Sequence, residues 1–474
     1  MKEYDLIIVG TGSALNYTGS IIEMNPDIKI AVIDKDDPGG ICLTRGCIPS
    51  KLLLYPADLI RLIGSASKFG IDVELKKIDF RKIMERMENI ISEDIEMIRR
   101  GLSSNPNIDY FKNVAEFAAP YKIKVGSDII TSKKIFLCTG SKPLIPDIKG
   151  LEDAGYHTSD TILKIKELPG SIAIIGGGYI AAEYGHFFSA MGSRVTVIGR
   201  NPQFIPEEEP EISALAIREM SKYMEIITGN EVLEVRKEEG RKKIHARDQS
   251  SSDDLIVSAD EILVASGRGP NMDISPEKGG IKTDEKGWIA VNEYLETSQS
   301  GIWAFGDADG KYLFKHVANY ESMVVFYNAF LRKKMKVDYH AIPHAVFSYP
   351  EIASVGLKEK EGLEKYGEIL IGFQRYEDTA KGIAMEARDF FVKVIVEKDK
   401  NRILGSHIIG PHASILIQEI VDLMYTKEEK ADPILYGMHI HPALSEVVER
   451  AFNSLMPPED YHHILVHLGF EKDQ

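Results

Sequence analysis

Cysteine is scarce in this chain: among 474 residues there are three, Cys42, Cys47 and Cys138. Three cysteines cannot form the disulfide framework that holds a small secreted domain together. The chain also lacks an apolar run near the roughly 20 residues that cross a bilayer, and its start, "MKEYDLIIVG", shows no cleavable signal pattern. We therefore expect a cytoplasmic protein without membrane association.

An excess of positive charge is missing as well. The 57 Lys and Arg residues are outnumbered by 72 Asp and Glu residues, which gives a formal net charge of −15, and the cations are scattered along the chain. This pattern argues against nucleic acid or an anionic membrane as the main partner. The content of 44% hydrophobic and 27% charged residues is typical of globular proteins. The length suggests about three domains.

Two segments share one pattern. Residues 4–34 predict a buried strand, a glycine turn that opens a helix, and a second buried strand. The pattern returns in residues 171–200, where we expect the helix to end at Gly192. A glycine turn lets the backbone approach a pyrophosphate at a helix N-terminus, so both segments predict dinucleotide sites. From about residue 341, alternating strands followed by helices predict a third, α+β domain.

Both glycine motifs depart from G-x-G-x-x-G at the third glycine, which is replaced by Leu15 in the first copy and by Ala181 in the second. That position serves helix-to-strand packing rather than phosphate contact, so we expect phosphate binding to persist while the first helix shifts locally. The glycines expected to approach phosphate are Gly10 and Gly12 in the first copy and Gly176 and Gly178 in the second.

The segment "GGICLTRGCIPSK", residues 39–51, contains two of the three cysteines. In a regular helix their Cα atoms would lie about 8.6 Å apart, whereas a disulfide needs less than about 7 Å. The glycines around the pair and Pro49, which removes a helical hydrogen bond, predict an irregular helix start that lets the thiols meet. A structural zinc site would need a second ligand pair, which is missing. Two incidental buried cysteines are the other alternative, and the distorting residues favour a redox pair.

The motifs taken together resemble the pyridine nucleotide-disulfide oxidoreductases, most closely the dihydrolipoyl dehydrogenases among them. "GGICLTRGCIPSK", "GGGYIAAE", "SGRGPN", "GIWAFGD", "VFSYPEIASVG" and "HPALSE" occur in that family's order. The resemblance implies an α/β fold with two Rossmann-like domains, for FAD and NAD(P), and a C-terminal α+β dimerisation domain in a homodimer. We expect the FAD domain over residues 1–150 and 269–340, the NAD(P) domain over 151–268 and the dimerisation domain over 341–474.

The resemblance also implies roles for single residues. Cys47 matches the thiol beside the flavin, and Cys42 the interchange thiol that meets the substrate sulfur. Lys51 and Glu183 match an ion pair near flavin N5. Cofactor contacts are implied for Gly10, Gly12, Asp34, Lys51, Ala115, Gly140, Gly176, Gly178, Arg200, Gly267, Asp307 and His316, and no metal site is expected.

His441 and Glu446 match a catalytic dyad that reaches the disulfide of the other subunit. Thiol–disulfide exchange needs a base near pH 7, and a carboxylate orients an imidazole for that task. His439 we leave as a turn or core residue, and Cys138, in the apolar run "IFLC", as a buried strand residue.

The residues expected to select between NADH and NADPH give opposing indications. Gly199 replaces the carboxylate that usually ends the second strand of an NAD site, and Arg200 follows it. This favours NADPH slightly over NADH. Against it, Pro206 stands where NADPH-using relatives carry a second arginine, three glutamates follow it, and Arg200 could be a solvated strand end.

The leading function is oxidation of a protein-bound dihydrolipoyl group with reduction of NAD(P)+, with a lipoyl domain of a 2-oxoacid dehydrogenase complex as a candidate partner. The alternative is NADPH-dependent reduction of a low-molecular-weight disulfide, as in mycothione or glutathione reductase. "YLFKHVANYE" and the altered first glycine motif resemble mycothione reductase, and Lys315 departs from dihydrolipoyl dehydrogenases. A non-catalytic flavoprotein subunit is a third alternative. Mercuric and high-molecular-weight thioredoxin reductases are disfavoured because a further C-terminal cysteine pair is missing.

Overall fold

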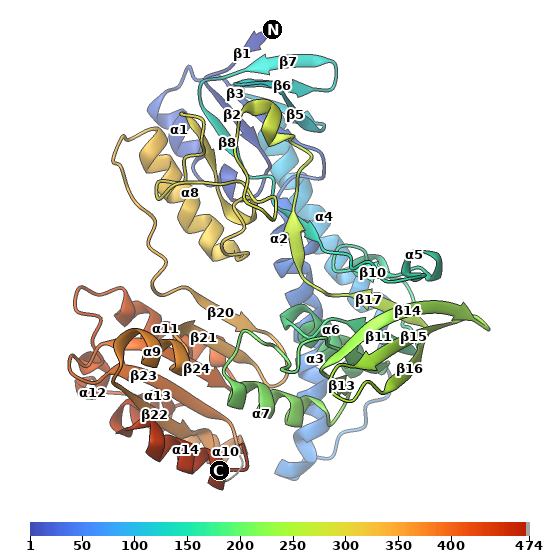
Figure 1. The fold of residues 1–474 in the computed structure, drawn as a ribbon, viewed down its shortest axis with the longest axis vertical. Coiled ribbons are helices and arrows are strands. Elements are labelled where there is room, and N and C mark those ends of the chain that lie inside the picture. Colours follow the sequence, from blue (N-terminus) through green and yellow to red (C-terminus); the bar gives the residue numbers. More distant parts are fainter. Residues whose placement is uncertain (471–474) are drawn as a thin grey trace.

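A computed structural model describes residues 1–470 of the chain. Three sheet-based parts are visible in Figure 1: one at the top, one at the lower right, and a third at the lower left that holds the C-terminal residues. The predicted α/β architecture, with two Rossmann-like units and a C-terminal α+β unit, is confirmed.

The first unit is built on a five-stranded parallel sheet of order β19-β8-β2-β3-β4. Its strands are β2 (Leu6–Val9), β3 (Ile30–Asp34), β4 (Ile108–Lys112), β8 (Ile135–Leu137) and β19 (Ile302–Ala304). A smaller sheet joins β1 (Lys2–Glu3), β5 (Ala115–Ala119), β6 (Lys122–Val125) and β7 (Asp128–Thr131). The central strands are buried on both faces, which explains their continuous apolar sequences.

The second unit repeats this plan with a five-stranded sheet of order β10-β17-β11-β12-β13. Its strands are β10 (His157–Thr158), β11 (Ser171–Ile175), β12 (Arg194–Ile198), β13 (Glu225–Ile227) and β17 (Glu261–Val264). An antiparallel meander follows β13, made of β14 (Asn230–Glu238), β15 (Arg241–Asp248) and β16 (Asp254–Ala259). The two units are connected through a two-stranded ladder of β9 (Ser141–Pro143) and β18 (Arg268–Pro270).

The third unit contains a six-stranded antiparallel sheet of order β20-β21-β24-β23-β22-β25. Its strands are β20 (Pro343–Val346), β21 (Ile352–Gly356), β22 (Ile369–Arg375), β23 (Phe391–Glu397), β24 (Ile403–Ile409) and β25 (Leu455–Met456). The helices of this unit are α9 (Glu359–Tyr366), α10 (Ala380–Ala384), α11 (Ala413–Met424), α12 (Asp432–Tyr436), α13 (Ser445–Asn453) and α14 (Pro458–His467).

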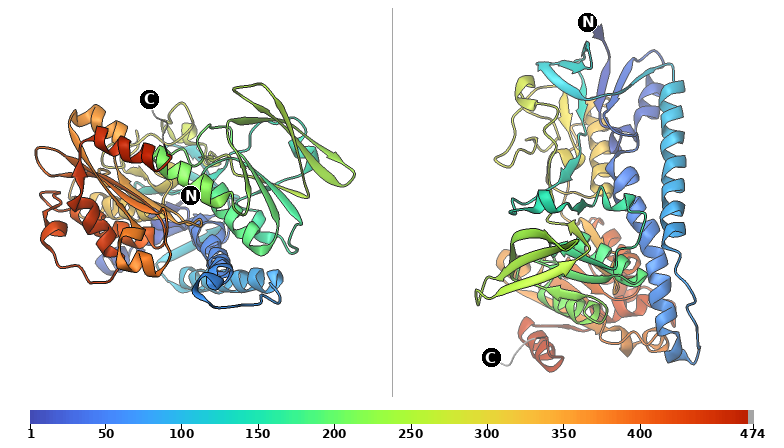
Figure 2. Two further views of the ribbon diagram at one scale, coloured as in Figure 1. Left: turned by 90° about the horizontal axis from the view of Figure 1, so that it is seen from below. Right: turned by 90° about the vertical axis from the view of Figure 1, so that its right-hand side faces the viewer.

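Two long helices tie the upper and lower parts together. α3 (Cys47–Ser65) and α4 (Phe80–Ser104) run beside each other along one edge of the molecule in the right panel of Figure 2. α3 also packs on α6 of the second unit, so the cysteine segment at its start is held between both dinucleotide units. The remaining helices are α1 (Thr18–Met24), α2 (Gly40–Arg45), α5 (Leu151–Ala154), α6 (Tyr179–Met191), α7 (Pro210–Met220) and α8 (Lys315–Ala329). Within residues 1–470, none of the helices has the length and apolar character needed to span a membrane.

The two glycine motifs differ in how they start their helices. In the second copy α6 begins at Tyr179, directly after Gly178, and ends before Gly192 as predicted. In the first copy a short 3-10 turn, Ser13–Leu15, follows the glycines, and α1 begins only at Thr18. The glycine turn is therefore separated from the helix that it was expected to open, and the local shift in helix packing expected from the leucine stays a prediction. The leucine side chain cannot pack as closely against the strand as a glycine would.

Candidate active site

A cavity of about 510 Å³ is lined by residues of all three units. It reaches from the end of β3, through the first glycine loop and the cysteine segment, to the start of α6. The cavity brings together eleven of the residues singled out in the sequence: Gly10, Gly12, Asp34, Cys42, Cys47, Lys51, Ala115, Gly140, Glu183, Asp307 and His316.

The cysteine segment consists of two helices instead of one. α2 ends at Arg45, Gly46 forms the break, and α3 begins at Cys47. A Cβ atom on Gly46 would lie 2.9 Å from the carbonyl oxygen of Ile41 and 3.2 Å from the Cα atom of Cys42, so only glycine allows this close approach. The predicted irregular helix start is confirmed. Both cysteines are present as thiols, and their side chains lie within hydrogen-bonding reach of each other.

The two thiols differ in acidity. A hydrogen bond from Cys42 lowers the pKa of Cys47 to about 7 against the opposing effect of burial, and the positive charge of Lys51 lowers it further. The same hydrogen bond to Cys47, together with burial, raises the pKa of Cys42 above its usual range. Near neutral pH the first thiolate of the reduced pair is therefore on Cys47.

Lys51 reaches the cavity from the first turns of α3. Its ammonium donates to both carboxylate oxygens of Glu183, on α6, at 2.9 and 2.8 Å. The backbone N–H of Phe347 donates to the same carboxylate at 3.1 Å, and the Phe347 ring lies 4.6 Å from the ammonium. One ion pair thus joins the two dinucleotide units and the third unit next to the thiols.

The far end of the cavity holds Asp34 at the end of β3, which accepts from the N–H and hydroxyl groups of Thr11 at 2.9 and 2.5 Å. Asp307 follows β19 and accepts from the hydroxyl of Ser141 at 2.5 Å, and burial raises the pKa of its carboxyl. His316 lies at the start of α8 and contacts the carbonyl oxygen of Pro343 at 2.8 Å.

The remaining predicted residues lie outside this cavity. Gly176, Gly178, Arg200 and Gly267 are in the second unit. His441 and Glu446 form their expected pair, with Nδ1 to Oε1 at 3.0 Å, at the start of α13. The imidazole is 69% exposed, whereas the carboxylate is 9% exposed and also accepts from the backbone N–H of Ala443. Neither residue of the dyad lines the cavity that holds the thiols, and its role toward a second copy stays a prediction.

Several cavity residues were not found by sequence reasoning. Arg45 pairs with Asp36 at 2.6 Å and Arg268 with Asp160 at 3.6 Å, so both cations close the cavity wall through ion pairs. Tyr179, the first residue of α6, also lines the cavity. Arg45 lies inside the cysteine segment, and this position could have indicated that its side chain lines the cavity. Tyr179 and Arg268 lie inside the motifs "GGGYIAAE" and "SGRGPN", in which only glycines and Glu183 were assigned roles.

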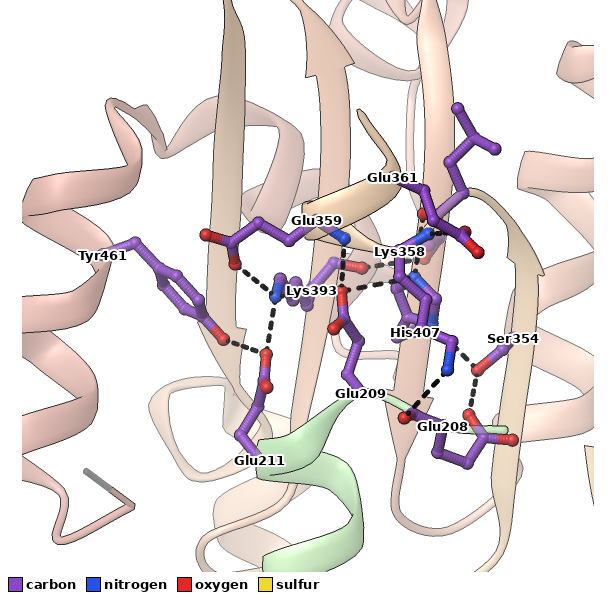
Figure 3. A network of polar contacts seen from close by, with 12 residues as sticks. Glu208, Glu209, Glu211, Ser354, Lys358, Glu359, Glu361, Lys393, His407 and Tyr461 are labelled. Atoms are coloured by element: carbon purple, nitrogen blue, oxygen red, sulfur yellow. Dashed lines mark hydrogen bonds and ion pairs between the residues drawn. The ribbon is translucent and has the colours of Figure 1, made fainter. Parts of the chain in front are cut away.

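The glutamates after Pro206 have a different role from the one expected. Glu208 accepts from Ser354, and Glu209 contacts Lys393 at 3.2 Å, both in the third unit (Figure 3). Glu208 also contacts His344 of the same unit at 2.7 Å. Two of the three carboxylates are thus engaged by groups of the third unit.

The end of β12 is shaped by a close backbone contact. A Cβ atom on Gly199 would lie 3.3 Å from the Cα atom of Gly177 in the second glycine loop, which leaves little room for a side chain. The next residue, Arg200, is exposed. The cation is thus the first side chain beyond the strand.

Two dinucleotide-binding units that meet at a dithiol define a thiol–disulfide oxidoreductase. The chain belongs to the pyridine nucleotide-disulphide oxidoreductase family: the model of that family matches residues 4–323, and the model of its dimerisation domain matches residues 342–452. It is an FAD-dependent disulfide oxidoreductase with Cys42 and Cys47 as its redox pair, and it uses NAD(P).

The chain is similar to mycothione reductase of Mycobacterium tuberculosis, with 34% identity over 96% of this chain and 100% of the relative. It is also similar to dihydrolipoyl dehydrogenase of Synechocystis, with 32% identity over 95% and 98% of the two chains. Among solved structures, the Cu(II) complex of the HOCl-induced flavoprotein disulfide reductase RclA from Escherichia coli matches with a TM-score of 0.85 and 26% identity. That match covers 96% of this chain and 99% of the other.

The residues of the cavity fit FAD. A carboxylate at the end of β3, a glycine loop between β2 and α1, and a lysine beside the thiols are spread along one continuous cavity. This order of donors and acceptors suits an elongated dinucleotide, with the glycine loop at its pyrophosphate. Asp34, Asp307 and Lys51 would be the charged groups that hold it.

Proposed function

We propose that the protein reduces a low-molecular-weight disulfide with NADPH. The observation that carries this proposal is the end of β12, where Gly199 leaves no carboxylate and Arg200 is the first exposed side chain, while Glu208 and Glu209 are bound in the third unit. An arginine at this position suits the 2′-phosphate of NADPH. NADPH-dependent members of such enzymes run toward disulfide reduction.

The cysteines carry out the exchange. The Cys42 thiolate attacks one substrate sulfur, the substrate S–S bond breaks, and the first product leaves as a thiol. The Cys47 thiolate then attacks the Cys42 sulfur, which releases the second product and leaves a Cys42–Cys47 disulfide. FAD held by Asp34, Asp307 and Lys51 would supply the two-electron chemistry that links NADPH to this disulfide. The balance is one NADPH and one proton for each disulfide reduced to two thiols.

The His441–Glu446 dyad of a second subunit supplies the proton. Glu446 holds Nδ1, so Nε2 is free to protonate a leaving thiolate and to accept the proton of Cys42. Hydrogen bonding to His441 lowers the pKa of Glu446, which keeps this carboxylate charged at neutral pH. The dimerisation domain that matches residues 342–452 would bring the exposed imidazole to the partner.

The second candidate function is that of a dihydrolipoyl dehydrogenase, which runs the same relay in reverse. It is supported by the "IPSK" ending of the cysteine segment and by the similarity to the Synechocystis enzyme. Its substrate would be a protein-bound dihydrolipoyl group, and its partner a 2-oxoacid dehydrogenase complex.

Steady-state kinetics of the FAD-loaded dimer tests the proposal. We expect NADPH oxidation by small disulfides to exceed NAD+ or NADP+ reduction by dihydrolipoamide, and Cys42→Ser to abolish both. Faster turnover of dihydrolipoamide would overturn the proposal in favour of the second candidate. If NADPH reduces the flavin but no thiolate absorption band follows and neither substrate turns over, the chain is a non-catalytic flavoprotein.

A further inference from the structure

A second cavity, of about 490 Å³, lies beside the cysteine segment and is lined in part by Gly39, Cys42 and Leu43. Its walls come from the first glycine loop, α1, the C-terminal part of α4 and the start of α3. The late start of α1 at Thr18 leaves Leu15 and Asn16 on this wall. The second cavity therefore lies at the point where the first glycine motif departs from G-x-G-x-x-G, at Leu15.

The second cavity has a defined relation to the thiol pair. Cys42 lines both cavities, whereas Cys47 lines only the first. The cavity that holds the cofactor residues thus meets both sulfurs, and the second cavity meets only the interchange thiol. A molecule in the second cavity would lie beside Cys42 and not beside Cys47.

Lys315, the first residue of α8, is the only charged residue among those that line the second cavity. Lys315 lines both cavities, and its ammonium donates to the hydroxyl of Ser13 in the first glycine loop at 2.9 Å. Its positive charge acts on Cys42, where it opposes the rise in the pKa of that thiol. The remaining walls are apolar apart from the amides of Asn16 and Asn105 and the hydroxyls of Thr11 and Thr18.

The other cations that line the first cavity all have carboxylate partners: Lys35 with Asp273, Arg45 with Asp36, Lys51 with Glu183 and Arg268 with Asp160. Lys315 has none within ion-pair distance in the part of the chain from residue 1 to 470. A half-buried ammonium whose only side-chain acceptor is a hydroxyl retains the capacity to bind an anion.

We propose that Lys315 is a specificity-determining residue that binds an anionic group, such as a carboxylate, of a small disulfide seated in the second cavity against Cys42. The inference rests on the proposed function, whose substrate class it narrows. A neutral lipoamide arm gains nothing from this ammonium, whereas a disulfide with a carboxylate near the sulfur gains a charge-assisted hydrogen bond.

A matched pair of probes tests the inference: dithiodiglycolate, a dianion, and its neutral diamide. In the FAD-loaded wild type we expect a higher kcat/KM for the dianion. Lys315→Met should lower the ratio of dianion to diamide kcat/KM about tenfold. Lys315→Arg, which keeps the charge, should retain most of the ratio. Lys286→Met removes the same charge from an exposed turn and should leave the ratio unchanged.

Four results would contradict the inference. An equal loss for both probes in Lys315→Met would mean that the lysine acts on Cys42 or on the Ser13 loop and not on the substrate. An unchanged kcat/KM for both probes in Lys315→Met would mean that the ammonium does not contact the anion. Turnover of the diamide without preference for the dianion in the wild type overturns the inference alone, whereas turnover of neither probe overturns the proposed function with it.

Discussion

Two lysines of this molecule, Lys393 and Lys315, differ in the hydrogen-bond and ion-pair partners of their ammonium groups. Lys393, on β23, is 1% exposed, and its ammonium contacts Glu211 at 2.6 Å, Glu359 at 2.8 Å and Glu209 at 3.2 Å. Lys315 is half-buried beside a cavity and donates to a single hydroxyl. One cation is saturated with carboxylates inside the protein, and the other keeps its charge available next to a thiol.

The saturated cluster is structural. Its three carboxylates lie close enough together to suit a metal ion, but the ammonium of Lys393 occupies their centre (Figure 3). Burial disfavours the charged lysine, yet the carboxylates outweigh this effect and raise its pKa. The hydroxyl of Tyr461 donates to Glu211 at 2.7 Å and completes the cluster. An ammonium enclosed by buried carboxylates, like that of Lys393, stabilises the packing between two units. An ammonium without a carboxylate partner, like that of Lys315, retains the capacity to bind an anionic ligand.

The two lysines should differ most in their contribution to the free energy of unfolding. Lys393→Met leaves three buried carboxylates without their cation and should lower the free energy of unfolding by about 3–5 kcal/mol. Lys315→Met removes no ion pair and should change it by less than about 0.5 kcal/mol. Urea denaturation of both variants, followed by circular dichroism, measures the two values. Similar losses of unfolding free energy in both variants would contradict the proposed difference between the two lysines.

Removal of the thiol donor should have the next largest effect. In Cys42→Ala the hydrogen bond that lowers the pKa of Cys47 is lost, so this pKa should rise from about 7 by roughly one unit or more, about 1.4 kcal/mol per unit. The thiolate forms as pH rises through this pKa and is lost as pH falls. Alkylation rates of Cys47 against pH, compared with the reduced wild type, give the midpoint; an unchanged midpoint would contradict this assignment.

Lys51 provides a weaker contribution to the same thiolate. Lys51→Met removes a nearby positive charge and should raise the pKa of Cys47 by less than Cys42→Ala does, since the hydrogen bond from Cys42 is the larger cause. The same alkylation profile measures it, with Lys286→Met as the charge control. A rise larger than that of Cys42→Ala would reverse the order of the two causes.

Arg200 should show the smallest effect because its side chain is exposed. Arg200→Met should lower the preference for NADPH over NADH several-fold, about 1 kcal/mol, through a higher KM for NADPH. Initial rates with each coenzyme provide the ratio, and the KM for NADH serves as the internal control. Equal changes for both coenzymes would indicate a structural role at the strand end.

The fold and the thiol pair could be predicted because their signals are local. Strand, glycine loop and helix are contiguous in residues 171–200, and the distortion at Cys42 and Cys47 follows from Gly46 within the same segment. The late start of α1 was harder, since a leucine in a glycine motif announces a shift without saying how far the helix moves.

Apart from the Lys51–Glu183 pair, which the family resemblance implied, contacts between distant segments could not be predicted. Glu208 and Glu209 stand close to Arg200 in the sequence, but they bond to Ser354 and Lys393, which the sequence places far away. The role of Lys315 likewise depends on α8 meeting the first glycine loop and Cys42. Residue spacing carries no information about which side of a loop faces which unit, so these assignments required the three-dimensional structure.

The loop between β12 and α7 constrains how this enzyme can change. Arg200, which we propose meets the coenzyme, and the glutamates that fasten the second unit to the third lie on one short stretch, from Gly199 to Glu211. Grafting the whole stretch from an NADH-dependent relative would exchange the coenzyme determinant and break the buried cluster at once. A change of coenzyme is therefore compatible with a stable protein only through replacements confined to the first half of the loop.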